Sequence, residues 1–215
     1  MNFPFEPAKA LAHLRAADDK LARVIDAIGP FAMQLKVSRS VFGALAEAIV
    51  YQQLSNKAAA TIYGRLEALY PRAKPAFTPA HVLRTHTNKL RSVGLSRAKV
   101  LALQDLARLA DAAELPTLEQ AHIIDDDALI ERLVMVRGIG RWSAEMFLMF
   151  RLGRPDVLPI DDYSLRKAYA KAFNKRKLPS PEALQKAGAK WRPYRTVASW
   201  YLWQSLNGPS PRSLE

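Results

Sequence analysis

Cysteine is absent from this chain of 215 residues, and that absence excludes several kinds of chemistry. Without a thiol, the protein forms no disulfide, no zinc or iron–sulfur site with cysteine ligands, and no thiolate nucleophile. Histidine is scarce as well. The four histidines, His13, His81, His86 and His122, lack the spacing of a metal site, and we expect them to be structural or surface residues.

Long apolar runs are also missing. No stretch approaches the roughly 18 apolar residues that a membrane-spanning helix requires, and residues 1–7 do not have the pattern of a signal peptide. Apolar residues make up 49% of the chain and aromatic residues 9%, which is typical of a globular protein. We therefore expect a soluble cytoplasmic protein that does not bind membranes.

The sequence contains no clear strand pattern of alternating apolar and polar residues. Apolar residues instead recur at helical spacing, which predicts an all-α fold with short connections. The predicted helices span 6–28, 81–85, 88–93, 127–135, 142–151, 162–173 and 194–206, and further helices begin after the capping residues Ser40, Ser55 and Ser96. We expect the ends, 1–5 and 208–215, to be frayed.

Positive charge dominates, with a net charge of +12, but it is unevenly distributed. Residues 111–131 include seven acids and no lysine or arginine, whereas residues 161–195 include ten bases and three acids. This asymmetry predicts one acidic and one basic face, as expected of a surface that meets a polyanion.

The segment 133–144 reads Leu-Val-Met-Val-Arg-Gly-Ile-Gly-Arg-Trp-Ser-Ala and predicts a helix, a tight turn and a second helix. Gly138 and Gly140 allow the backbone to turn sharply and to approach a ligand closely. They lie where the second helix exposes unpaired N–H groups and the positive end of its dipole. The turn therefore predicts a phosphate site, the alternative being an ordinary connection between helices.

Some twenty residues later, Asp161 and Asp162 precede a basic helix. A hairpin followed by an acidic residue in this order resembles the helix-hairpin-helix (HhH-GPD) superfamily of DNA glycosylases, and within it the 3-methyladenine DNA glycosylase II (AlkA-like) family. Further segments that resemble this family are 28–30, 48–59, 94–99 and 191–203. About thirty residues precede Phe31, so the chain resembles the compact form without an N-terminal α/β domain.

This resemblance implies a two-lobed helical fold with an active-site cleft between the lobes. One lobe would comprise 1–38 and 155–215, and the other 39–154, ending in a hairpin at about 127–151. The partner would be double-stranded DNA, bound by a monomer that in a bacterium would associate with the nucleoid.

The activity that the resemblance implies is that of a monofunctional DNA glycosylase in base excision repair. Such an enzyme flips out alkylated bases, such as 3-methyladenine and 7-methylguanine, and hydrolyses the N-glycosidic bond to leave an abasic site. Members that also cleave the strand carry a lysine nucleophile where this chain has Trp142, so no lyase activity is expected.

By the same resemblance, Asp162 is the catalytic residue, because its negative charge would stabilise the oxocarbenium character of the sugar. Asp161 would support the start of the helix that follows or the local backbone. The alternative is that both residues are helix caps.

The resemblance places aromatic residues on the walls of the base pocket, where an indole face would attract a cationic alkylated base. The pocket residues are Trp142, Trp203 and Tyr51, with Met146 at a position where some relatives carry tyrosine. Met146 therefore leaves the shape of the pocket, and with it the substrate range, open. Packing in the core is the alternative for these aromatic residues, and it is the one that we expect for Trp191 and Trp200.

Contacts with DNA are implied at two places. In the segment Gln52-Gln53-Leu54-Ser55, Gln53 or alternatively Leu54 would fill the gap left by the flipped base, unless Leu54 lies in the core and the glutamines merely end a helix. At the hairpin, the resemblance implies phosphate contacts from Gly138, Gly140, Arg141 and Ser143.

Further candidates for backbone contacts are Lys167, Lys171, Arg192 and Arg195, although a run of charge is often only a solvated face. In relatives a structural Na⁺ or K⁺ binds backbone carbonyls of the hairpin, which correspond here to Val134, Val136 and Ile139. No cofactor is expected to be required.

Two alternative functions stay open. One is a glycosylase for deaminated or etheno purines, because Trp142 argues against only the lysine-dependent branches. The other is a non-catalytic DNA-binding protein that uses the same hairpin.

Overall fold

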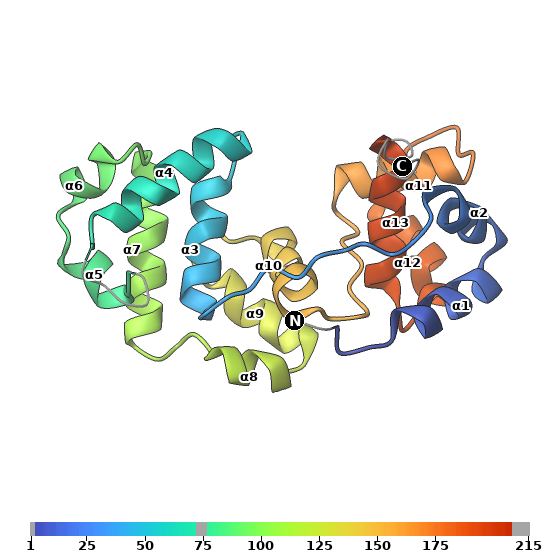
Figure 1. The fold of residues 1–215 in the computed structure, drawn as a ribbon, viewed down its shortest axis with the longest axis horizontal. Coiled ribbons are helices and arrows are strands. Elements are labelled where there is room, and N and C mark those ends of the chain that lie inside the picture. The colour runs from blue at the N-terminus through green and yellow to red at the C-terminus, as the bar shows by residue number, and fades with distance from the viewer. Residues whose placement is uncertain (1–2, 72–76, 208–215) are drawn as a thin grey trace. The chain divides into compact units, whose positions relative to one another are not determined.

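The computed structural model describes residues 3–71 and 77–207. Within these ranges every regular element is a helix and none is a strand, which confirms the all-α prediction (Figure 1). No helix in the described ranges is both long enough and apolar enough to cross a membrane. The predicted frayed ends, 1–2 and 208–215, lie outside these ranges, whereas Phe3 and Phe5 pack against Phe31.

The chain divides into two compact units. Unit 1 consists of Met1–Lys36 together with Leu148–Glu215, and unit 2 consists of Val37–Phe147. The division predicted from the sequence has its boundaries after residues 38 and 154. In the structure, the helical turn Leu148–Leu152 that continues the hairpin's second helix belongs to unit 1.

The part of unit 1 that the structure describes contains five α-helices, a π-helical turn and a short 3-10 helix. Its α-helices are α1 (Pro7–Ala17), α2 (Asp19–Ile28), α11 (Tyr163–Ala172), α12 (Pro181–Gly188) and α13 (Arg195–Asn207). The π-helical turn is Leu148–Leu152 and the 3-10 helix is Ala189–Trp191. Because α1 and α2 pack with α13, the N-terminal helices complete a core that the C-terminal segment supplies.

The single helix predicted over 6–28 is wrong, because the chain breaks at Asp18. Asp18 is extended, with φ −156° and ψ 103°, and its Oδ1 accepts the N–H groups of Lys20 and Leu21. Its Oδ2 accepts the indole N–H of Trp191 at 2.9 Å and contacts Lys190 Nζ at 2.8 Å. This buried carboxylate therefore caps α2 and joins it to the 3-10 helix.

The core of unit 1 is rich in large side chains that are fully buried. Trp191 and Tyr201 are the largest, and the Tyr201 hydroxyl donates to the Gly29 carbonyl at 2.8 Å. Burial raises the pKa of Tyr201 to about 12. Trp200 is also buried, in contact with Phe31. The prediction that Trp191 and Trp200 are core residues is confirmed.

In its described residues, unit 2 contains eight α-helices: α3 (Val41–Tyr51), α4 (Asn56–Ala68), α5 (Pro79–Arg84), α6 (Thr87–Ser92), α7 (Arg97–Asp111), α8 (Leu118–Ile123), α9 (Asp126–Val134) and α10 (Arg141–Phe147). Ser40, Ser55 and Ser96 cap α3, α4 and α7 as predicted, each accepting a backbone N–H three residues on. The buried faces of α3 and α7 pack together (Figure 1).

The helix α8 was not predicted, although its signal is present. The Thr117 hydroxyl accepts the N–H of Gln120, and the Gln120 side chain accepts the N–H of Thr117. This reciprocal capping box stabilises the start of a helix of only six residues. A longer apolar pattern is missing because the helix buries one side chain, Ala121.

Candidate functional site

Asp162 lies directly before α11 as the N-cap residue, and it is half-buried. Its Oδ1 atom accepts the backbone N–H of Leu165 and also the indole N–H of Trp203, the latter at 3.1 Å. An acidic N-cap is favourable because its charge faces the positive end of the helix dipole. The two donors hold this carboxylate in one orientation within unit 1.

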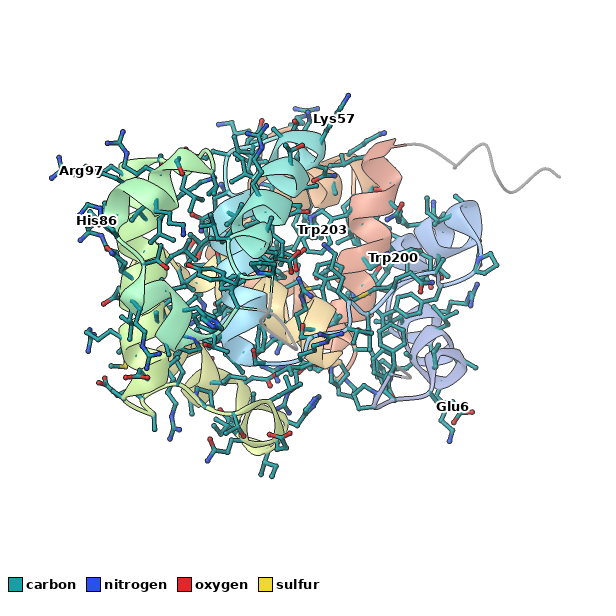
Figure 2. The ribbon with its side chains drawn as sticks, turned by 60° about the vertical axis from the view of Figure 1, so that its left-hand side comes forward. Glu6, Lys57, His86, Arg97, Trp200 and Trp203 are labelled. Carbon is teal, nitrogen blue, oxygen red and sulfur yellow. The ribbon has the colours of Figure 1, made fainter. Side chains whose placement is uncertain are left out.

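Trp203 reaches Asp162 from α13, a helix far from α11 in the sequence. Its ring stacks on Phe150, with centroids 6.3 Å apart and planes at 26°. Trp200 and Trp203, on the same helix, are labelled in Figure 2. Unlike buried Trp200, Trp203 keeps part of its surface exposed, so it combines a fixed indole N–H with a ring that remains accessible.

The assignment of Asp161 as the residue that supports the helix start is wrong. The first helical residue is Tyr163, so the capping position falls on Asp162, and the Asp161 side chain is exposed. The cap and the candidate catalytic carboxylate are therefore the same residue. Capping and catalysis are compatible roles, since the cap uses an oxygen without changing the charge.

The predicted hairpin is present in unit 2, formed by α9, the turn 135–140 and α10. Gly138 has φ +80°, a conformation that strongly favours glycine. The backbone N–H of Arg137 donates to Asp105 Oδ2 on α7 at 2.8 Å. The turn is thus anchored to a long helix, while Gly138 and Gly140 stay exposed.

The 52–55 loop connects α3 to α4 and is tied to the hairpin. Gln52 Nε2 donates to the Gly138 carbonyl at 2.8 Å. Gln53 is exposed and has φ +56°, which is unusual for a residue other than glycine. Leu54 is 39% exposed, so the alternative that it is a core residue is wrong. Both candidate gap-filling side chains are accessible.

Lys99 also holds the start of this loop, a role that the resemblance of segment 94–99 to the family did not identify. Its Nζ donates to the carbonyls of Val50 at 2.6 Å and of Gln52 at 2.8 Å. These carbonyls end α3, where the negative end of the helix dipole favours a cation. Burial lowers the pKa of Lys99. Lys99 therefore fixes the end of α3 from the first turn of α7.

The candidate aromatic residues of unit 2 lie on α3 and α10. Trp142 is 45% exposed at the start of α10, and Met146, one turn later, is half-buried. Tyr51 is half-buried and meets Tyr63 edge-on, with ring centroids 6.5 Å apart. Trp142 is one of the most exposed aromatic residues in the described chain, which argues against a packing role.

Several candidate phosphate contacts are already engaged within the protein. Arg195 is only 14% exposed, and its guanidinium contacts Asp156, as does that of Arg192. Lys171 donates to the Ser205 carbonyl, and Arg141 pairs with Asp127 and with the buried Glu145. Lys167 and Ser143, by contrast, make no side-chain hydrogen bond or ion pair in the described residues.

The hairpin carbonyls proposed for a cation have mixed environments. The Val136 carbonyl accepts the N–H of Ile139 at 3.0 Å, which leaves it one lone pair. Val134 is the last residue of α9, so its carbonyl has no partner farther along the helix. The donor set of backbone oxygens suits a hard monovalent cation better than a transition metal.

Together these residues form three local arrangements. Unit 1 holds a carboxylate oriented by an indole. Unit 2 holds an exposed glycine turn next to a loop that presents Gln53 and Leu54, and a helix that presents Trp142. A fixed negative charge and accessible aromatic faces suit a cationic reaction centre, and an exposed glycine turn at the start of a helix suits phosphate.

Comparison with known proteins agrees with this chemistry. Residues 46–193 match the HhH-GPD superfamily of base excision DNA repair proteins. DNA-3-methyladenine glycosylase 1 of Schizosaccharomyces pombe is 32% identical over 198 residues, covering 92% of this chain and 86% of the relative. Alkylbase DNA glycosidase-like protein mag2, from the same organism, is 28% identical. This match covers 91% of this chain and 92% of the relative.

Solved structures show the same relationship. The 3-methyladenine DNA glycosylase of S. pombe in complex with abasic DNA superposes with a TM-score of 0.80 at 32% identity, over 93% of this chain and 97% of that one. A DNA-3-methyladenine glycosidase from Bacillus halodurans gives a TM-score of 0.82 at 33% identity, over 91% and 88% of the two chains.

Proposed function

Since the chain belongs to the HhH-GPD superfamily of base excision DNA repair proteins, we propose that it is a monofunctional DNA glycosylase that removes alkylated bases from double-stranded DNA. It would act as a monomer, flip out bases such as 3-methyladenine and 7-methylguanine, and hydrolyse the N-glycosidic bond. The names of its relatives support this substrate class.

The observation that carries the proposal is the pairing of Asp162 with Trp203. As the base departs, the sugar gains oxocarbenium character, and a carboxylate held in one orientation stabilises that charge without having to reorganise. The bonds from Leu165 N–H and Trp203 Nε1 supply this orientation. An alkylated purine already carries positive charge, so it leaves readily once the sugar cation is stabilised.

Recognition of the base would fall to the exposed indole faces. A cationic purine stacked on Trp142 or Trp203 gains cation–π attraction that a neutral base lacks. Tyr51 and Met146 would complete the walls. Since Trp142 stands where strand-cleaving members have their lysine, hydrolysis would stop at the abasic site.

The 52–55 loop would stabilise the flipped state, with Gln53 entering the duplex and Leu54 and Ser55 beside it. The hairpin would hold the backbone through Gly138, Gly140, Arg141 and Ser143, with Lys167 as a further contact. A Na⁺ or K⁺ on the carbonyls of Val134, Val136 and Ile139 would neutralise a phosphate there. No cofactor takes part in the reaction.

The decisive test is Asp162→Asn, assayed by release of 3-methyladenine and 7-methylguanine from methylated DNA under single-turnover conditions. Asparagine is also a good N-cap, so the fold is expected to persist while the charge is lost. We expect release to slow by at least about 100-fold, the scale of removing one electrostatic stabiliser.

Asp161→Asn is the matched control, because it makes the same chemical change at the exposed neighbour and should release bases like the wild type. Equal rates for wild type and Asp162→Asn would overturn the catalytic assignment. Release of hypoxanthine or ethenoadenine in preference to methylated bases would instead favour the deaminated or etheno class, and no release by wild type would favour a binding protein.

A further inference from the structure

A second concentration of positive charge lies in unit 2, outside the segment 161–195. Residues 52–99 include nine bases and one acid, Glu67. Six of these bases are exposed in the described residues, and we call them the 57–97 surface. They are Lys57, Arg65, Arg84, Lys89, Arg91 and Arg97.

The charges of the 57–97 surface are not neutralised within the part of the chain that the structure describes. None of its six side chains makes an ion pair or a hydrogen bond there. In 161–195, by contrast, half of the ten bases donate to partners within unit 1: Arg166, Lys171, Lys190, Arg192 and Arg195. Unpaired charges raise the local potential more than paired ones and attract a polyanion.

Three members of the 57–97 surface lie next to the 52–55 loop or to the helix that holds it. Lys57 is in the first turn of α4, directly after the loop. Arg97 opens α7, two residues before Lys99, which donates to the loop. In Figure 2 the side chains of Lys57 and Arg97 project away from the ribbon.

Arg91 lines an open concavity of about 580 Å³ formed by α6 and the α6–α7 connection, whose other lining residues include Ser92, Gly94 and Ser96. Gly94 has φ +108°, and a Cβ there would lie 3.1 Å from Ile62 on α4. This close approach packs the α6–α7 connection onto α4, the helix that carries Lys57. The three cations therefore lie on α4, at the end of α6 and at the start of α7, elements that meet through Gly94, Ile62 and Lys99.

We propose that Lys57, Arg91 and Arg97 bind the sugar–phosphate backbone of the DNA strand opposite the damaged strand. The inference rests on the proposed function, because a side chain that enters a duplex from the 52–55 loop has one strand on each side. Gln52 ties the loop to the hairpin, which would hold the damaged strand. Lys99 ties it to α7, which begins at Arg97, and we place the phosphates of the other strand against these cations.

The test uses the triple variant Lys57→Gln, Arg91→Gln, Arg97→Gln and a duplex that carries a tetrahydrofuran abasic-site analogue. All three side chains are exposed, so the fold should persist, and thermal unfolding checks this. We expect the affinity for this duplex to fall about 10- to 100-fold at 0.1 M salt, because about three phosphate contacts are lost. The magnitude of the slope of log affinity against log salt concentration should decrease by about 2 to 3.

The opposite-strand assignment is tested with methylphosphonate linkages, which remove phosphate charge, placed in either strand. In the opposite strand these linkages should lower the DNA affinity of the wild type but not that of the triple variant. The triple variant should bind the damaged strand alone, as a single strand, with the same affinity as the wild type. The matched control is Lys175→Gln, Arg176→Gln, Lys177→Gln, which removes the same charge from an exposed segment of unit 1.

Equal losses for the two triple variants would overturn the proposal, since only net charge would then matter. The triple variant could lose equal affinity for single-stranded and duplex DNA, or methylphosphonates could weaken binding only in the damaged strand. Either result would place the 57–97 surface on the damaged strand and overturn the proposal. Base release by saturating enzyme, measured in parallel, should be unchanged in the triple variant. If the wild type binds the duplex but releases no base, the proposed function is refuted, whereas the assignment of the opposite-strand contacts still stands or falls on the binding data.

Discussion

Oδ1 of Asp162 accepts two hydrogen bonds from groups of different origin. The Leu165 N–H comes from the residue's own helix and would be available to any capping side chain. The Trp203 indole comes from another helix and is therefore the specific element of the arrangement. At this scale, the contribution of the indole N–H can be separated from that of the aromatic ring.

Trp203→Phe should reduce single-turnover base release about tenfold or more. It deletes the N–H donor but keeps a ring that stacks on Phe150, and a hydrogen bond to a charged group contributes about 1.5–3 kcal/mol. Trp200→Phe, on the same helix, is the control: it should lower stability and leave the rate intact. Unchanged release by Trp203→Phe would show that the indole N–H does not orient the carboxylate.

Among helices and loops, the 52–55 loop is constrained from two sides. Gln52 donates to the hairpin, and Lys99 donates to the last carbonyls of α3 and to Gln52 itself. Gln53 directly follows the anchored residue and has a left-handed backbone conformation. Such a conformation persists only where its surroundings enforce it. Lys99 is thus a positioning residue for Gln53 and Leu54.

Lys99→Met should impair base flipping more than chemistry. Methionine keeps the aliphatic bulk but loses both hydrogen bonds, so the loop should lose its fixed geometry. We expect weaker binding of damaged duplex and a reduced 2-aminopurine fluorescence increase next to the lesion, with a smaller change in the rate at saturating enzyme. Lys99→Arg should restore part of the signal.

A purely structural role for Lys99 would lower stability without changing the flipping signal. Lys186→Met, at an exposed position of α12, controls for loss of one positive charge.

The elements themselves were largely predictable, because their signals are local. Ser40, Ser55 and Ser96 cap helices at the predicted positions, and apolar spacing indicates α7 and α13 correctly. The break at Asp18 was missed because the apolar spacing continues across it. Segment 94–99 was noted for its resemblance to the family, but the contacts of Lys99 could not be predicted, since its acceptors lie 49 and 47 residues away.

The candidate site was predictable only through resemblance. Its residues were identified from motifs, whereas the contact of Trp203 with Asp162 spans 41 residues and that of Gln52 with Gly138 spans 86. Conversely, the basic segment 161–195 suggested DNA contacts at Arg192 and Arg195, but the structure pairs both with Asp156. A sequence gives the charge of a segment but not which charges are neutralised in the fold.

At the scale of the whole molecule, the buried charge of Asp18 joins segments far apart in the sequence, because its partners include Lys190 and Trp191. Burial by itself would raise the pKa of Asp18, but hydrogen bonds from Lys190, Trp191 and Leu21 outweigh it and hold the pKa below its usual value. A carboxyl whose pKa is lower in the folded state stabilises the fold above its unfolded pKa. That stabilisation disappears as pH falls through the lower, folded value.

Asp18→Asn should therefore destabilise the protein at neutral pH by about 3 kcal/mol, the scale of breaking a buried, hydrogen-bonded charge pair. The difference from wild type should shrink as pH falls below about 4, measured by chemical denaturation. Asp26→Asn, which breaks the exposed pair with Arg15, should cost less than about 1 kcal/mol. A difference that is independent of pH would contradict the assigned charge.

The discontinuity of unit 1 has a consequence for the order in which the protein can be made. Asp18 can bond to Trp191 only after 173 further residues have been added to the chain, and Gly29 can bond to Tyr201 only after 172. At about 5–20 residues per second, a ribosome needs on the order of ten to thirty seconds for that distance. Unit 2 emerges whole in between, so it can fold during synthesis. The first two helices must wait with their apolar faces exposed, which makes them the segment on which a nascent-chain chaperone would act.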